Sequence, residues 1–341
     1  MKILVSGATG YIGSHTVLEL INAGFKVVAV DNLTNSSLES LKRVEKLSKC
    51  KIPFYKLDIR NKSALKKVFD KHSIEAVIHF AGLKSVNESF LKPVEYYNNN
   101  LGGTFSLIEV MKEFNCKIFL FSSSASVYGD PQSIPIKENA PLSGSNPYSR
   151  SKIMIEQYLQ DVFNTSDNYY LGILRYFNPI GAHKSGLIGE DPNDIPNNLM
   201  PYVLRVAVKN NLNSNLDDVY NYLSIFGSDY DTPDGTCQRD FIHVVDLAKA
   251  HVAAVKKIGS FDNFEVFNIG TGKGTSVLEI VESFKNINNI KLPYVIKDRR
   301  PGDNAVTFCD CQKANKMLLW NAELDIYDIC LDTYNFAKAN N

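Results

Sequence analysis

The first 31 residues contain the pattern that most restricts the fold. A short apolar run, Ile3–Val5, leads into the segment GATGYIG, in which Gly7, Gly10 and Gly13 precede apolar residues at helical spacing in Ser14–Ala23. Glycines at a strand-to-helix turn permit a tight bend and let a phosphate approach the N–H groups at the positive end of the helix. The sequence therefore predicts a dinucleotide-binding turn at the start of an α/β fold.

An aspartate follows this turn at the position that selects the cofactor. The second apolar run, Val27–Val30, ends at Asp31, 18 residues beyond Gly13. A carboxylate there accepts hydrogen bonds from both ribose hydroxyls and would repel a 2′-phosphate, so we predict NAD rather than NADP. The alternative is an aspartate that merely ends a strand. Asp58 closes the third apolar run and either reaches the adenine or caps the helix that follows.

Apolar runs alternate with helical stretches through the first half of the chain. Further strands are expected at Phe54–Leu57, Ala76–Phe80 and Lys117–Phe121, with helices at Ser63–His72 and Gly103–Glu113. Fully apolar strands between helices imply a parallel sheet that is covered on both faces. We predict an α/β fold, a doubly wound (Rossmann-type) parallel sheet with a smaller mixed α/β C-terminal substrate domain.

The alternation breaks down after about Tyr176, where proline and glycine become frequent. Helices are expected at Leu199–Lys209, Val245–Lys257 and Ser276–Asn286, and the asparagine-rich stretch Lys209–Tyr222 reads as an exposed loop. We place a cofactor-binding domain at residues 1–177 and a substrate-binding domain at residues 178–341, with some later segments returning to the first domain.

The composition excludes several classes of partner. Lys and Arg total 37, as do Asp and Glu, and this balance argues against a nucleic acid or a membrane surface held by charge. No apolar run approaches the roughly 18 residues of a membrane-spanning helix, and MKILVSGATG reaches glycine before a signal-peptide core develops. Cys309 and Cys311 are the only close pair of the six cysteines, and a lone C-x-C is a poor zinc site. We therefore predict no metal, reduced thiols and a cytoplasmic location.

Tyr148 and Lys152 form a Y-x-x-x-K pair at the start of an expected helix that runs to about Phe163. This spacing puts both side chains on one helix face. The ammonium group and the positive nicotinamide ring would favour the phenolate and lower the phenol pKa from about 10. Ser122–Ser124 directly follow an apolar strand, at the edge where doubly wound sheets bind ligands. These hydroxyls either bind a substrate oxygen or mark a polar transition from strand to loop.

With GATGYIG, Asp31, SSSASVYG and YSRSK in this order, the chain resembles the extended short-chain dehydrogenase/reductase superfamily, and within it the UDP-glucose 4-epimerase family. The narrower resemblance rests on blocks spread along the whole chain. They are HFAGLKSVNES (His79–Ser89), EYYNNN (Glu95–Asn100), LRYFNPIGAH (Leu174–His183), GEDPNDIPNNLMPY (Gly189–Tyr202), DGTCQRDFIHVVDLA (Asp234–Ala248) and RRPGD (Arg299–Asp303).

The resemblance implies an enzyme that interconverts UDP-glucose and UDP-galactose with a tightly held NAD, which is reduced and reoxidised within one turnover. By this resemblance Tyr148 removes the proton of the sugar 4-hydroxyl while hydride leaves C4. Ser124 hydrogen-bonds that oxygen, and Lys152 tunes the phenol and holds the nicotinamide ribose. The 4-keto sugar then rotates and takes the hydride back on its opposite face. The family also suggests a homodimer, formed by helices of the first domain.

Two larger sets of residues are implied by the same resemblance. Around NAD it places Gly7, Gly10, Tyr11, Ile12, Gly13, Asp31, Asn32, Ser36, Asp58, Ile59, Phe80, Ala81, Lys84, Asn99 and Phe177. Around the UDP-sugar it places Asn178, Asn198, Leu199, Ser224, Ile225, Phe226, Arg239, Arg300, Asp303 and Thr307. Arg239 and Arg300 also make chemical sense independently, because a diphosphate suits guanidinium groups, although surface ion pairs are the alternative.

The chain departs from the family pattern at three places. Ser149 follows Tyr148 where the family usually has glycine, and we expect little effect. The loop Lys209–Tyr222 is longer than its usual counterpart. Thr307 stands where the family carries either tyrosine or a small residue against the sugar. A small side chain leaves room for a 2-acetamido group, so we hypothesise that UDP-GlcNAc and UDP-GalNAc are accepted as well.

Two other functions are compatible with this fold. A nucleotide-sugar 4,6-dehydratase usually places an Asp-Glu pair after the active-site hydroxyl, whereas Ala125 and Ser126, which cannot act as acid or base, follow Ser124. A non-catalytic NAD-binding sensor would be expected to lose Tyr148, Lys152 or the arginines, and all of these are present.

Overall fold

Seven parallel strands form the central sheet of the computed structural model, which describes residues 1–165, 169–192, 196, 198–212, 215–300 and 302–341. The strand order is β11-β6-β5-β4-β1-β2-β3. The strands are β1 (Lys2–Ser6), β2 (Lys26–Asp31), β3 (Phe54–Lys56), β4 (Ala76–His79), β5 (Ile118–Ser124), β6 (Tyr170–Tyr176) and β11 (Phe264–Ile269). The order reverses at β1, which lies between β2 and β4, and ligands bind beyond the carboxyl ends of the strands at such a point.

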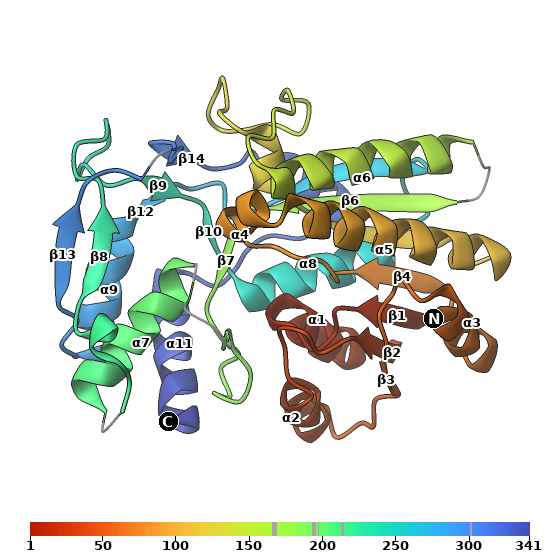
Figure 1. Cartoon of the computed structure of the whole chain (residues 1–341), viewed down its shortest axis with the longest axis horizontal. Coiled ribbons are helices and arrows are strands. Elements are labelled where there is room, and N and C mark those ends of the chain that lie inside the picture. The colour runs from red at the N-terminus through yellow and green to blue at the C-terminus, as the bar shows by residue number, and fades with distance from the viewer. Residues whose placement is uncertain (166–168, 193–195, 197, 213–214, 301) are drawn as a thin grey trace.

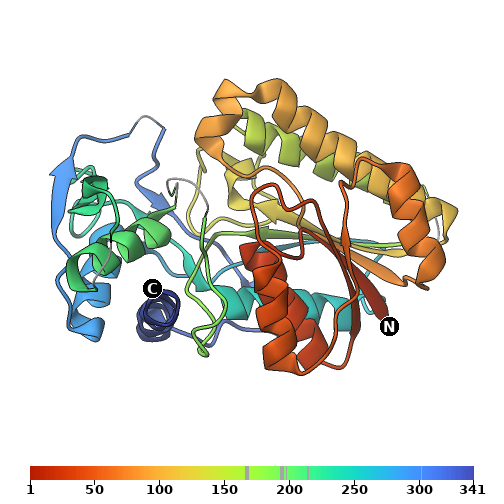
Figure 2. The same ribbon diagram turned by 60° about the horizontal axis from the view of Figure 1, so that its bottom comes forward.

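Helices cover both faces of this sheet, which Figure 2 shows edge-on between two helical layers. One layer contains α1 (Tyr11–Asn22), α2 (Glu39–Ser48), α8 (Val244–Lys257) and α10 (Gln312–Leu318); the other contains α3 (Lys62–Lys71), α4 (Val86–Leu91), α5 (Pro93–Glu113) and α6 (Pro147–Asn164). Alternate residues of β1 serve the two layers, because Ile3 and Val5 join the core under α1 and Leu4 joins the core under α5. The predicted doubly wound sheet is confirmed.

A smaller mixed α/β part gathers beyond one end of the sheet (Figure 1). Its helices are α7 (Leu199–Asn211), α9 (Val277–Asn288) and α11 (Ile326–Asn340), and its strands are β7 (Asn178–Ile180), β8 (Leu223–Phe226), β9 (Gln238–Arg239), β10 (Phe241–His243), β12 (Thr275–Ser276), β13 (Tyr294–Lys297) and β14 (Val306–Thr307). A separate apolar core, with Val203, Val281 and Phe284 at its centre, holds this part together. Two later elements return to the main sheet, because α8 belongs to one of its helical layers and β11 is one of its strands.

The polar stretch Lys209–Tyr222 is more regular than the loop expected from its composition. Lys209–Asn211 close α7, and a 3-10 helix, η2 (Asp218–Tyr220), precedes β8, while residues 213 and 214 lie outside the described residues. The Asn211 side chain explains the difference. It donates to the carbonyl of Ala207 at 2.8 Å and exchanges hydrogen bonds with the backbone of Lys291. Asparagine there satisfies backbone groups at the helix end.

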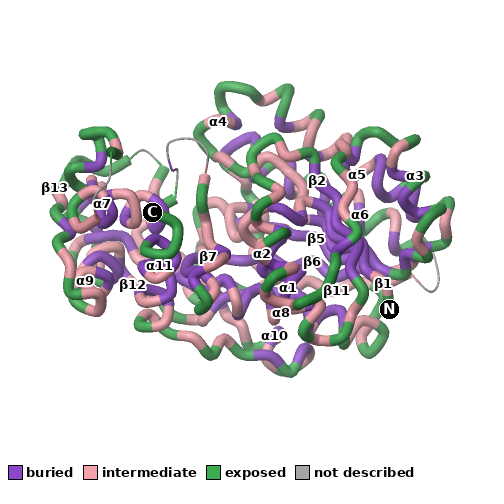
Figure 3. The backbone as a smooth tube through the Cα atoms, turned by 90° about the horizontal axis from the view of Figure 1, so that it is seen from below, coloured by how far each residue is buried: buried purple, intermediate pink, exposed green. Residues whose placement is uncertain are grey.

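Burial follows the layers closely (Figure 3). The inner strands of the central sheet are mostly buried, whereas the edge strands β3 and β11 are partly accessible to solvent and the outer faces of the helices are exposed. No helix in the described part of the chain is long and apolar enough to cross a membrane.

Candidate functional site

The glycine turn between β1 and α1 leaves no space for side chains. Gly7 has φ +71°, and a Cβ atom there would lie 2.7 Å from the backbone nitrogen of Ala81. A Cβ atom on Gly13 would lie 2.1 Å from the carbonyl oxygen of Gly7. Gly10 is the N-cap of α1 and supplies no side chain to it, so the first N–H groups of the helix remain available to an anion. The turn therefore fits the pyrophosphate of a dinucleotide.

Asp31 lies at the carboxyl end of β2 with its carboxylate held in place. One oxygen accepts the backbone N–H of Thr9 at 3.1 Å, and the other accepts the N–H of Leu33 at 2.9 Å and the hydroxyl of Ser36 at 3.2 Å. The hydroxyls of Thr9 and Ser36 are themselves 2.6 Å apart. The carboxylate is thus fixed beside the glycine turn, where a cofactor ribose would lie.

Asp58 does not cap the helix that follows it. Asn61 is the N-cap of α3 and accepts the N–H of Ala64 at 3.1 Å. Asp58 instead pairs with Arg60 at 2.6 Å, and this hydrogen-bonded guanidinium lowers the pKa of the carboxyl. The capping alternative is therefore wrong, and the position of Asp58 after β3 leaves the adenine assignment as a proposal.

The Tyr148–Lys152 pair occupies the first turns of α6. A capping box fixes the start of this helix, with Asn146 accepting the N–H of Ser149 at 2.8 Å and the Ser149 hydroxyl accepting the N–H of Asn146 at 3.2 Å. The Lys152 ammonium lies 5.9 Å from the centroid of the Tyr148 ring and donates to the carbonyl of Ser122 at 2.7 Å. The side chain of Ser124, at the end of β5, hydrogen-bonds Tyr148. Phenol, ammonium and hydroxyl therefore meet at the carboxyl edge of the sheet.

Burial controls the charge of both α6 side chains. It raises the pKa of Tyr148, while the hydrogen bond from Ser124 lowers it in part. Burial also lowers the pKa of Lys152 to about 8, and the negative charge of Glu156 opposes this change. The folded chain by itself therefore holds the phenol protonated at neutral pH. The lowering expected from the sequence requires the nicotinamide charge in addition to Lys152.

Arginines and an aromatic ring assemble around the β9–β14 pair. Thr307 of β14 lies opposite Arg239 of β9 in the register of the two strands. Asp303 accepts a hydrogen bond from Arg300 at 2.9 Å and lies 3.8 Å from the guanidinium of Arg239. The Arg300 guanidinium is 5.0 Å from the centroid of the Phe226 ring. Two cations and a ring on one surface can hold a diphosphate and a base.

Strand β8 divides its residues between two faces. Ser224 and Phe226 are partly exposed, whereas the side chain of Ile225 is buried in the C-terminal core. Ile225 can therefore offer a ligand only its backbone, unlike its two neighbours.

Hydrogen bonds and an ion pair connect three of the remaining predicted residues to other parts of the chain. The Tyr11 hydroxyl donates to the carbonyl of Gly181 at 2.6 Å, which joins the glycine turn to the segment after β7. Lys84 and Asn198 both contact the Glu190 carboxylate, at 3.1 and 2.9 Å. Ile59 and Phe177 are buried, Asn32 is exposed, and the partly buried residues are Ile12, Phe80, Ala81, Asn99, Asn178 and Leu199.

The sequence analysis missed several residues that orient this site. Asn100 of α5 accepts the N–H of Leu83 at 2.8 Å and donates to its carbonyl at 3.1 Å, which fixes the segment bearing Lys84. Glu156 and Arg175 form a buried ion pair at 2.6 Å behind Lys152. The position of Glu156, four residues after Lys152 on the same helix face, was the available signal. Nothing in the local sequence pointed to Arg175.

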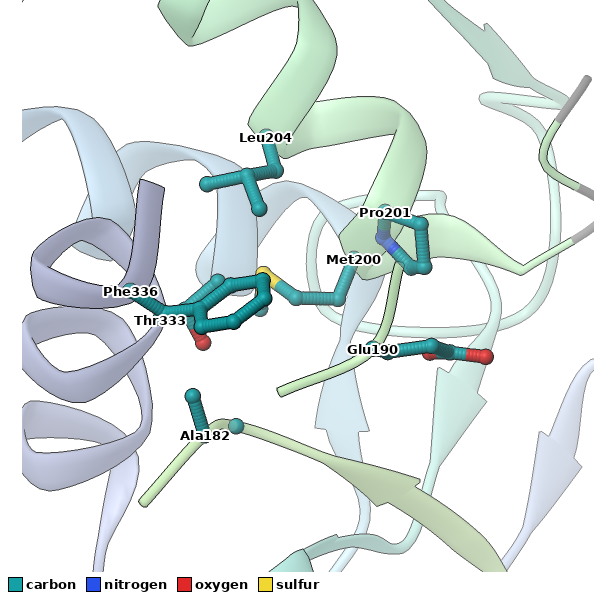
Figure 4. Close-up of a pocket in the computed structure, with 8 residues that line it drawn as sticks. Ala182, Glu190, Met200, Pro201, Leu204, Thr333 and Phe336 are labelled. Carbon is teal, nitrogen blue, oxygen red and sulfur yellow. The ribbon is translucent and has the colours of Figure 1, made fainter. Parts of the chain in front are cut away.

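A small cavity lies between α7 and α11 (Figure 4). It measures about 10 Å³, which is room for about one water molecule. Met200 and Phe336 are among the side chains that line it, and the carboxylate of Glu190 is directed away from them. The cavity is therefore a packing defect beneath the Glu190 segment and not a substrate site.

The cysteines and histidines offer no metal site that the structure describes. No group of three or more His, Cys, Asp or Glu side chains in the described residues is arranged to hold a metal ion. The six cysteines are free thiols, and Cys309 hydrogen-bonds both Cys311 and, at 3.2 Å, Asp240.

Sequence comparison with known proteins identifies a family and several full-length relatives. The NAD dependent epimerase/dehydratase family matches residues 3–270. UDP-glucose 4-epimerase of Bacillus subtilis (strain 168) is 48% identical over 340 residues, covering 100% of this chain and 98% of the relative. UDP-glucose 4-epimerase of Dictyostelium discoideum is 51% identical, covering 99% and 96%.

Solved structures extend this likeness to the whole fold. The crystal structure of UDP-glucose 4-epimerase from Bifidobacterium longum, in complex with NAD+ and UDP, superposes with a TM-score of 0.92 and is 47% identical. The alignment covers 100% of this chain and 99% of that one. The chain therefore belongs to the NAD dependent epimerase/dehydratase family.

Proposed function

We propose that this chain interconverts UDP-glucose and UDP-galactose through a 4-keto intermediate, using NAD bound at the glycine turn. The observation that carries this proposal is the meeting of Ser124, Tyr148 and Lys152 at the carboxyl edge of β5. Full-length similarity to proteins named UDP-glucose 4-epimerase supports it.

The chemistry divides between the cofactor and three side chains. Bound NAD would supply a hydride acceptor and donor for C4 of the sugar, and return of the hydride to the opposite face of the 4-keto sugar would leave no net oxidation. Tyr148 accepts the proton of the 4-hydroxyl as the ketone forms and returns it as the alcohol re-forms. Ser124 hydrogen-bonds the same oxygen. Lys152, held by the carbonyl of Ser122, keeps a positive charge beside the phenol and favours its ionised form.

The nucleotide half of the substrate would lie across the β9–β14 pair. Arg239 and Arg300 supply guanidinium groups for the diphosphate, with Asp303 holding both in place. Phe226, against Arg300, supplies a ring on which uracil can stack. The sugar then reaches toward Tyr148. Residues 1–177 would hold NAD and the catalytic side chains, and residues 178–341 would bind UDP, with α8 and β11 returning to the main sheet.

Thr307 suggests a wider range of sugars. It lies beside Arg239 in β14, and its side chain is much smaller than tyrosine. We propose that the freed volume admits a 2-acetamido group, so that UDP-GlcNAc and UDP-GalNAc are also substrates.

An apolar surface at the α4–α5 corner suggests a second copy of the chain as partner. Val86, Phe90, Leu91 and Val94, which we call the corner patch, expose large apolar side chains, with Leu91 83% and Val94 80% exposed. Exposed patches of apolar side chains are typical of sites at which proteins associate. We propose a homodimer formed through this patch. The cytoplasmic location stays a prediction from the reduced thiols.

One assay separates this function from its alternatives. Purified protein is given UDP-galactose without added NAD, and UDP-glucose formation and absorbance at the NADH band are followed. We expect product without net NADH. Tyr148→Phe, which removes only the proton acceptor, should lose about 100-fold or more in kcat.

The other outcomes identify the other functions. A 4-keto-6-deoxy product would instead indicate a dehydratase. Bound NAD with no turnover of any UDP-hexose would indicate a sensor.

A further inference from the structure

Three consecutive serines at the end of β5 contact α6, and each of them contacts a different residue of that helix. The carbonyl of Ser122 accepts the ammonium of Lys152 at 2.7 Å. The hydroxyl of Ser123 donates to the carboxylate of Glu156, and the side chain of Ser124 hydrogen-bonds Tyr148. The contact of Ser123 therefore lies between the two contacts that align the catalytic side chains.

Glu156 is itself fixed from the opposite side. Its carboxylate receives three hydrogen bonds from the Arg175 guanidinium of β6, at 2.6, 3.1 and 3.2 Å, and both side chains are nearly inaccessible to solvent. Arg175 also donates to the hydroxyl of Tyr128 at 3.0 Å and to the carbonyl of Glu138 at 2.9 Å. The Tyr128 hydroxyl donates in turn to Asn268 at 2.6 Å. This network joins α6 to β6 and β11.

The placement of this ion pair is informative because burial of two charges is expensive. Apolar side chains of similar volume often stabilise a core as well as a buried ion pair does. Glu156 lies one helical turn from Lys152 on α6, and Arg175 of β6 lies opposite Ser123 of β5 in the register of the two strands. We infer from this location that the Glu156–Arg175 ion pair has a role in the reaction in addition to stabilising the fold.

We propose that Glu156 is a positioning residue, which acts through Ser123 and through its own charge to keep Lys152 and Ser124 aligned with Tyr148. The inference rests on the proposed epimerase function. The titratable groups that face Lys152 are Tyr148 and Glu156 on its own helix and His79 at the end of β4. Only Glu156 opposes the effect of burial on the ammonium. Arg175 holds the Glu156 charge in place from β6.

Glu156→Gln tests this proposal because it keeps the shape and the acceptor for Ser123 but removes the charge. We expect kcat to fall by about 10-fold or more, with the KM for UDP-galactose unchanged within about two-fold. The basic limb of the kcat–pH profile should move to lower pH by about one unit, since Lys152 then loses its proton more easily. Ser123→Ala should lower kcat without moving the basic limb, because the charge remains.

Glu265→Gln is the matched control, since Glu265 pairs with Lys313 near the far edge of the sheet. It should leave kcat and the pH profile unchanged. A folded Glu156→Gln protein whose basic limb matches the wild type overturns the inference, as does an equal loss of kcat in Glu265→Gln. Should Glu156→Gln fail to fold, an unchanged kcat in Ser123→Ala overturns it. An inactive wild type in the same assay would instead refute the proposed function.

Discussion

Thr307 is the residue at which a single side chain is expected to set substrate choice. Replacement by tyrosine fills the space beside Arg239 and should exclude a 2-acetamido group but spare a 2-hydroxyl group. We expect Thr307→Tyr to lose about 10-fold or more in kcat/KM on UDP-GalNAc and to stay within about two-fold of wild type on UDP-galactose. Steady-state kinetics on the two sugars measure this difference.

Thr307→Ser is the control for this substitution, because it keeps a small hydroxylated side chain. It should retain both activities. Undetectable wild-type turnover of UDP-GalNAc would contradict the hypothesis outright, and an equal loss on both sugars in Thr307→Tyr would indicate general damage to the strand.

Residue identity and spacing were sufficient to predict candidate site residues that lie close together in the sequence. Gly7 and Asp31 could be found because the turn and the strand end lie at fixed distances in sequence. Tyr148 and Lys152 could be found because four residues make one helical turn. Arg175 could not, since its contact with Glu156 depends on how α6 packs on β6. Ile225 shows the same limit, because only the fold decides which face of β8 becomes core.

At the scale of elements, the stability of α6 depends on the capping of its N-terminus. Pro147 is its first residue, and Asn146 and Ser149 satisfy each other's N–H groups in a capping box. Glycine at position 149 would remove one of these hydrogen bonds and add the conformational entropy of a flexible residue. We expect Ser149→Gly to lower the free energy of unfolding by about 1–2 kcal/mol, as measured by urea denaturation.

Ser149→Ala separates the two contributions to this loss. Alanine removes the reciprocal hydrogen bond but keeps a good helix former, so its effect should be the smaller one. An alanine variant as stable as the wild type would show that the hydrogen bond from the Asn146 N–H to the Ser149 hydroxyl contributes no net stability. From the sequence we expected serine in place of glycine at position 149 to have little effect. The capping role of Ser149 could not be predicted, because its partner Asn146 is recognised only once the start of α6 is known.

The bounds of helices and strands were predicted well where a single hydrophobic pattern ran through the element. Strands such as β1 and β4 have apolar central residues because both faces of the sheet are covered, and each of their ends lies within one residue of the expected position. Helix α7 ends at Asn211, two residues beyond the expected Lys209, because Asn211 hydrogen-bonds the backbone of Ala207 and Lys291, although asparagine in general favours loops.

At the scale of the whole molecule, the corner patch predicts the state of assembly. Leu91→Glu together with Val94→Glu would place charges in the proposed interface while changing only exposed side chains. We expect the wild type to elute as a dimer and this variant as a monomer in light scattering coupled to size exclusion. Tyr327→Glu, at an exposed position of α11, is the control and should stay dimeric. A wild type that is monomeric at all concentrations contradicts the proposal.

Three buried imidazoles make the fold sensitive to acid. Burial lowers the pKa of His15 and His79 to about 3 and that of His251 to about 4. The unfolded chain binds protons at these residues below about pH 6.5, whereas the native protein does not, so stability falls as the pH drops from that value toward about 4. Each imidazole contributes up to about 1.4 kcal/mol per pH unit in this window.

Replacement of one imidazole should flatten this dependence. His251→Phe keeps the ring packing on Phe80, 4.8 Å away, but removes the titrating group. The free energy of unfolding, measured in urea between about pH 6 and about pH 4.5, should then fall less steeply by about 1 kcal/mol per pH unit. His72→Phe is the control, because His72 is partly exposed and its pKa is lowered less. Equal slopes for wild type and His251→Phe would mean that the native protein takes up the proton at His251, so that its burial does not exclude the charged form.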